Sequence, residues 1–148
     1  AARDLVYDIL IYPRQLDAAV AFARALPDQA LVLDHIAKPN IAQLDPAAWQ
    51  PGFEALGELE HVSCKVSGMV TEAKWNQWSA DDFRHYLDEA LDAFGEDRLM
   101  YGSDWPVCLF AGSYEQAFRL IDDYARGLTD ADRAGLFGGN GARFYGVR

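Results

Sequence analysis

Four apolar, strand-like runs alternate with amphipathic helical segments along the chain, and this alternation restricts the fold more than any other feature. The expected strands cover residues 5–11, 31–35, 62–69 and 99–104. After each strand, apolar residues recur at spacings of three and four, as on one face of a helix. A repeated strand–helix order requires parallel pairing with the helices outside the sheet. We therefore predict an α/β chain of four βα units.

Capping residues predict where the helices begin. Side chains that can accept a hydrogen bond from the first helical turn precede four segments, at Asp45, Ser113, Thr129 and Asn140. Pro51 is expected to bend the second helix or restart it. We expect Trp49 and Phe53 of that helix to pack in the core against the sheet.

Two polar residues stand where expected strands end. Asp104 follows the run Leu99–Tyr101 and His35 follows Leu31–Leu33, and a proline comes soon after each. Ligands bind beyond the carboxyl ends of the strands in parallel α/β folds, so both side chains are candidates for chemistry. Taken alone, each has a structural alternative: Asp104 as a turn or helix cap, and His35 as a hydrogen-bonded structural residue.

Lys65 lies in the middle of the third expected strand. A period of two places Ser63, Lys65 and Ser67 on one face of that strand. A buried lysine is costly unless a carboxylate or a ligand meets it. If the sheet closes into a barrel with His35 and Asp104 at its mouth, Lys65 either lies below that mouth or pairs with Asp8 inside the barrel.

Composition excludes several classes of function. The chain has 148 residues, of which 51% are apolar, and a net charge of −10, which disfavours nucleic acid and anionic membrane surfaces as partners. No transmembrane run or export signal is evident, so the expected compartment is the cytoplasm. Cys64 and Cys108 lack metal-type spacing and are expected to be free, buried thiols. No glycine-rich phosphate-binding loop follows any strand.

Four motifs together resemble the amidohydrolase-related family. They are LDHIAKP, CKVSGM, EDRLMYGSDWPV and GGNGARFYGV, in this order over nearly the whole chain. The group most similar to them contains the fuconolactone, rhamnonolactone and pyrone dicarboxylate lactonases. The resemblance implies a TIM-type (β/α)8 barrel, of which residues 1–148 are the carboxyl-terminal half of one domain. A complete barrel needs about 200 residues or more, and the family's HxH pair is absent, because no two of the three histidines are two positions apart.

The resemblance also implies an activity: a hydrolase that opens a small sugar-derived or dicarboxylate lactone with activated water. It makes Asp104 the general base and places His35 beside the missing HxH pair. It implies either one divalent metal, zinc first, with His35 and Asp104 as ligands, or a reaction without metal. The expected contacts to substrate oxygens come from Lys38, Lys65, Ser67 and Trp105.

The sequence leaves two alternatives open. One is a non-oxidative decarboxylase of the same superfamily. The other is a half barrel without catalysis, whose two exposed strand edges pair with another copy. For the enzyme, the expected partners are a small-molecule substrate and either the missing amino-terminal half or a second copy of the chain.

Overall fold

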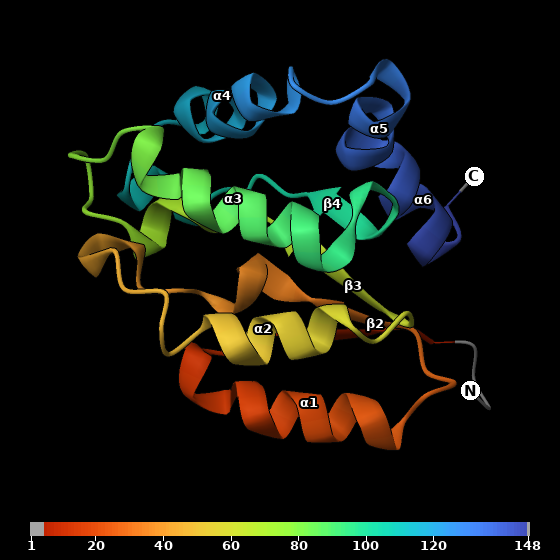
Figure 1. The fold of residues 1–148 in the computed structure, drawn as a ribbon. Helices are drawn as coiled ribbons and strands as arrows, with labels where there is room; N and C mark the ends of the chain where they lie inside the picture. Colours follow the sequence, from red (N-terminus) through yellow and green to blue (C-terminus); the bar gives the residue numbers. More distant parts are fainter. Residues whose placement is uncertain (1–4, 148) are drawn as a thin grey trace.

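Four parallel strands, hydrogen-bonded in sequence order, form the centre of the protein (Figure 1). The computed structural model describes residues 5–147. The strands are β1 (Tyr7–Ile9), β2 (Leu31–Leu33), β3 (Val62–Val66) and β4 (Leu99–Tyr101). All three strand pairs are parallel, which confirms the predicted topology. The strands are shorter than the sequence suggested.

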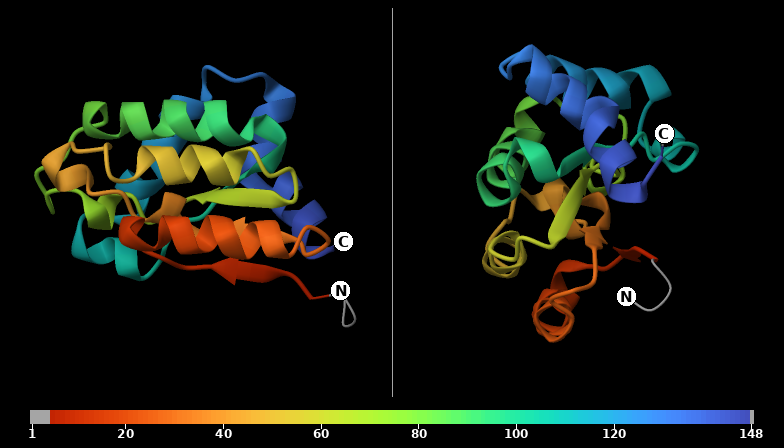
Figure 2. Two further views of the ribbon diagram at one scale, coloured as in Figure 1. Left: turned by 60° about the horizontal axis from the view of Figure 1, so that its bottom comes forward. Right: turned by 90° about the vertical axis from the view of Figure 1, so that its right-hand side faces the viewer.

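The α-helices between residues 16 and 125 cover one side of the sheet and follow its curvature, as the right-hand view of Figure 2 shows. The α-helices are α1 (Leu16–Ala25), α2 (Gln50–Gly57), α3 (Asp81–Phe94), α4 (Tyr114–Ala125), α5 (Asp130–Ala134) and α6 (Asn140–Tyr145). No helix in the range 5–147 is long and apolar enough to cross a membrane. The caps predicted at Ser113 and Thr129 are confirmed, since each side chain accepts from the backbone N–H three residues later.

Two predicted helix starts are wrong. Asp45 caps only a turn, with its carboxylate accepting from the N–H of Ala47, and α2 begins at Gln50 because Pro51 fits best in a first helical turn. Asn140 does not cap α6. It is the first residue of that helix, and its buried amide donates to the carbonyls of Glu96 and Leu99.

The core lies between the sheet and the helices. Alternate strand residues such as Leu33, Cys64 and Leu99 are buried there. The prediction that Trp49 and Phe53 pack in the core is confirmed: both are buried, and their rings stack with 4.3 Å between centroids. Burying each of these aromatic side chains contributes about 2–3 kcal/mol.

The other, concave face of the sheet is more polar. It carries the intervening residues, including Asp8, Ser63 and Lys65, and α6 contacts it through Tyr145. The strand order leaves β1 and β4 each with one edge unpaired by any strand in the described part of the chain. A four-stranded parallel sheet with helices on its convex side is half of a (β/α)8 barrel.

Arg98 joins three elements at the amino-terminal end of the strands. Its guanidinium donates to the carbonyls of Gly57 at the end of α2, Leu59 just after it, Val62 of β3 and Ala93 of α3, at 2.9–3.2 Å. α2 and α3 come so close here that a Cβ atom on Gly57 would lie 2.5 Å from the Ala93 carbonyl oxygen. Nothing in the local sequence pattern signals this contact.

Replacing Arg98 with methionine should lower the free energy of unfolding by about 3 kcal/mol, because hydrogen bonds to a charged donor are lost and carbonyls are left unpaired. Arg98→Lys should be intermediate, since an ammonium cannot reach as many acceptors as a guanidinium. Urea denaturation measures both. As a control, Arg119→Ala at the exposed Arg119–Glu115 pair should change stability by less than about 1 kcal/mol. Equal effects at the two sites would contradict the role of Arg98.

Candidate active site

The chain turns immediately after β2 and presents His35 at the carboxyl end of the sheet. Residues His35, Ile36, Ala37 and Lys38 all have positive φ, from 45° to 59°. Consecutive non-glycine residues in this region are uncommon and are maintained only where the surroundings fix them. Asp104, in the loop after β4, also has a positive φ of 54°. Both strand-end residues predicted from the sequence therefore lie in strained turns.

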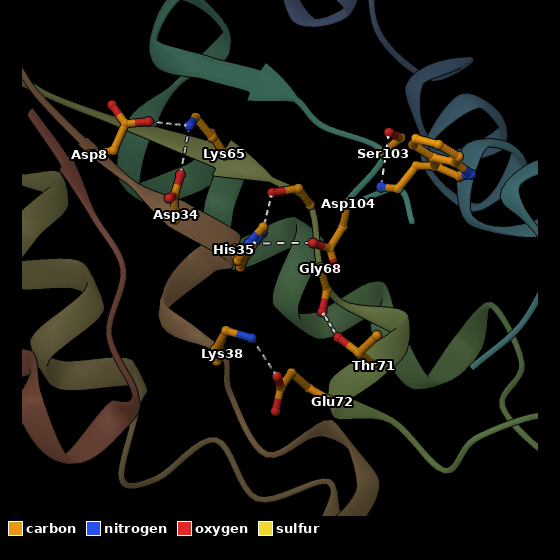
Figure 3. Close-up of polar contacts among 12 residues, drawn as sticks. Asp8, Asp34, His35, Lys38, Lys65, Gly68, Thr71, Glu72, Ser103 and Asp104 are labelled. Atoms are coloured by element: carbon orange, nitrogen blue, oxygen red, sulfur yellow. Dashed lines mark hydrogen bonds and ion pairs between the residues drawn. The ribbon is translucent and has the colours of Figure 1, made fainter. Parts of the chain in front are cut away.

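His35 and Asp104 face each other at this end of the sheet (Figure 3). His35 Nε2 lies 3.6 Å from Asp104 Oδ1, and their side chains are 19% and 11% exposed. The second oxygen, Asp104 Oδ2, is buried with no hydrogen-bond partner among residues 5–147. A buried acceptor without a partner is rare in proteins and is a position where water or substrate can bind.

Burial lowers the pKa of His35 below its usual value, although the neighbouring carboxylates of Asp104 and Asp34 act in the opposite direction. The imidazole is therefore neutral at neutral pH. A neutral imidazole beside a carboxylate can serve as a hydrogen-bond donor or as a metal ligand, and the carboxylate can accept a proton.

Ser67 follows β3, which lies between β2 and β4 in the sheet. Its hydroxyl lies 2.7 Å from His35 Nδ1, and the residue is buried. The predicted site residues Ser67, His35 and Asp104 are thus in one contiguous group.

Lys65 lies deeper, below this group, and is surrounded by acidic partners. Its ammonium is 2.6 Å from Asp8 Oδ2 and 2.7 Å from Asp34 Oδ1, while Tyr145 donates its hydroxyl to Asp8 at 2.9 Å. Burial acts to lower the pKa of Lys65, but hydrogen bonds to Asp34, Asp8 and Tyr145 outweigh it and raise the pKa above its ordinary value. Lys65 thus lies below the mouth and also pairs with Asp8; its contact with substrate stays a prediction.

Lys38 and Glu72 form an ion pair at the mouth, with 3.1 Å between Nζ and Oε1. Figure 3 shows both side chains on the same side of the His35–Asp104 pair. Sequence reasoning missed Glu72 and Asp34, although each comes soon after a strand and could have been found by the rule that located His35. Trp105 is 64% exposed, and its role in substrate binding stays a prediction.

A zinc site usually takes at least three protein ligands. His35 Nε2 and Asp104 Oδ1 are two donors at suitable spacing, but residues 5–147 contain no cluster of three or more potential ligands. The described part of the chain therefore fits a portion of a zinc site and does not complete one.

Comparison with known proteins connects this geometry to a family. A family profile described as Amidohydrolase matches residues 1–147. The chain is 46% identical to an L-fucono-1,5-lactonase of Burkholderia multivorans and 38% identical to one of Burkholderia ambifaria, in each case over 99% of its own length. It covers 53% and 51% of those proteins, so it spans about half the length of the curated relatives it matches.

Among solved structures, an amidohydrolase from Burkholderia multivorans with bound zinc matches with a TM-score of 0.93 and 47% identity. The match covers 99% of this chain and 54% of that one. The predicted half barrel and the resemblance drawn from the four sequence motifs are both confirmed. The chain belongs to the amidohydrolase family.

Proposed function

We propose that this chain carries the general base and a carbonyl-binding imidazole of a lactone hydrolase. The observation that carries the proposal is the His35–Asp104 pair, with the partnerless Asp104 Oδ2 beside it. Support also comes from the family and from two relatives named L-fucono-1,5-lactonase.

The proposed reaction is the hydrolysis of a cyclic ester. Asp104 takes a proton from a water molecule as that water attacks the carbonyl carbon, and the neutral imidazole of His35 donates a hydrogen bond to the oxygen that becomes negative. The bond from the carbonyl carbon to the ring oxygen then breaks, and the proton passes to that oxygen. The product is an open-chain hydroxy acid.

We further propose a sugar-derived lactone without charge as the substrate. Each lysine near the site already contacts a carboxylate: Lys38 at the mouth contacts Glu72, and Lys65 below it contacts Asp8 and Asp34. With Asp104 added, carboxylates outnumber lysines in this group. A dicarboxylate lactone would meet net repulsion there, whereas sugar hydroxyls can donate to the carboxylates and accept from the lysines.

The rest of the site is proposed to come from a polypeptide that completes the barrel, either the missing amino-terminal half or a second copy of this chain. The unpaired edges of β1 and β4 and the length of the relatives support this arrangement. If that polypeptide supplies further ligands, His35 and Asp104 would hold zinc, and the metal would then polarise the lactone carbonyl in place of the His35 N–H. We propose the cytoplasm as the compartment of such an enzyme.

Asp104→Asn should reduce kcat for lactone opening about 100-fold or more, because a carboxamide cannot take the proton from water. The KM should change little. The assay follows acid release from L-fucono-1,5-lactone by the chain co-expressed with the part of the Burkholderia multivorans relative that it does not cover.

Asp92→Asn, at an exposed position on α3, is the matched control and should retain full activity. An unchanged rate in Asp104→Asn would remove Asp104 from the role of base. Release of carbon dioxide from an aromatic acid, with no lactone opening, would favour the decarboxylase alternative instead.

Glu72→Gln should change the preference among substrates, because it leaves the Lys38 ammonium without its carboxylate. The ratio of kcat/KM for a carboxylated lactone to that for an uncharged sugar lactone should rise about three- to tenfold, equivalent to about 1 kcal/mol. The effect should weaken as salt is added. Glu115→Gln on the outer helix α4 is the control, and an equal ratio in both variants would contradict the charge argument.

A further inference from the structure

The imidazole of His35 is closely packed on one side. Gly68, which has a φ of +62°, lies directly against the ring, and a Cβ atom there would be 2.7 Å from both Cγ and Nδ1 of His35. Behind Ser67, a Cβ atom on Gly102 would come within 2.9 Å of the serine Cβ. The two glycines therefore allow Ser67 and the ring to pack in a space that would not accept another methyl group.

The polar neighbour of Ser67 in this space is the imidazole of His35. Its hydroxyl lies 2.7 Å from His35 Nδ1, and the residue is only 4% exposed. A serine hydroxyl can donate one hydrogen bond and accept others, so it can partner either neutral form of the ring. The hydrogen bond by itself does not decide which ring nitrogen carries the proton.

Asp104, on the opposite side of the ring, decides which ring nitrogen carries the proton. A carboxylate only accepts hydrogen bonds, and Oδ1 is 3.6 Å from Nε2. A proton on Nε2 places a positive N–H edge toward the carboxylate, whereas a proton on Nδ1 would place a lone pair against it. The first arrangement is electrostatically favoured, and it leaves Nδ1 free to accept the hydroxyl proton of Ser67.

We propose that Ser67 is a positioning residue that donates to Nδ1 of His35 and holds the neutral ring with its proton on Nε2. This refines the expectation that Ser67 contacts substrate, because a buried hydroxyl committed to His35 acts through the ring. The catalytic consequence rests on the proposed function: the Nε2–H is the group that would donate to the developing oxyanion. The tautomer itself does not depend on that function.

The decisive measurement is the 15N spectrum of the histidine rings in the 148-residue chain after chelator treatment, at about pH 7.5, where the ring is neutral. Protonated and bare ring nitrogens differ strongly in 15N chemical shift, and His35→Gln identifies the signals. We expect Nε2 of His35 to be protonated and Nδ1 bare. A wild-type spectrum with the proton on Nδ1 would overturn the proposal without any variant being needed.

Ser67→Ala should then change the His35 signals toward a mixture of tautomers and leave those of His61 and His85 unaltered. Ser63→Ala makes the same change at the other end of β3 and should leave the His35 spectrum as in wild type. If Ser67→Ala does not fold, Ser67→Cys keeps a similar shape with a weaker donor and should show the same change in smaller measure. An unaltered His35 spectrum in the folded variant would also overturn the proposal.

Activity of the complemented chain supplies a second readout. If Ser67 acts through His35, Ser67→Ala should lower kcat about tenfold or more with little change in KM. If Ser67 instead contacts the substrate directly, its loss would raise KM. If no lactone is opened while the expected tautomer is found, the proposed function fails and the positioning role stands. If lactone is opened while Nδ1 carries the proton, the positioning role fails alone.

Discussion

Parallel pairing of β2, β3 and β4 is the constraint on which the site depends. Because the three strands run in the same direction, their carboxyl ends lie at one edge of the sheet, and residues far apart in sequence meet there. His35 and Asp104 come from strands that are not neighbours, with β3 between them. They approach to 3.6 Å across the end of β3, where Gly68 lies directly against the imidazole.

Charged side chains near the same edge of the sheet are arranged in pairs of opposite sign. Lys65 is bound by Asp8 of β1 and by Asp34 at the end of β2, so one ammonium ties three adjacent strands together on the concave face. Nearer the mouth, Lys38 and Glu72 form a second pair. Removing one partner from such a group would leave an uncompensated charge, which is more costly than the pair is stabilising. These pairs thus keep acidic residues close to His35 without leaving either lysine alone.

The strained backbone lies at one end of the sheet, and the hydrogen bonds that join the helices to the strands lie at the other. At the carboxyl end, four consecutive residues from His35 to Lys38 adopt positive φ, and the buried contacts around them maintain that conformation. At the amino end, Arg98 gathers carbonyl groups from α2, β3 and α3. Separating the strained, reactive end from the supporting end is the usual arrangement of (β/α) barrels, in which the two ends of the strands have different roles.

The sequence by itself determined the order of strands and helices, the parallel sheet, the aromatic core around Trp49 and Phe53, and the two strand-end residues His35 and Asp104. These follow from short-range periodicity, capping residues and one rule about strand ends. Only the tertiary structure decided that α2 begins at Gln50, that Lys65 is bound by Asp34 as well as Asp8, and that Glu72 and Arg98 have partners. Those contacts join residues on different elements, and their distances depend on how the strands curve and how closely the helices pack, which no local pattern encodes.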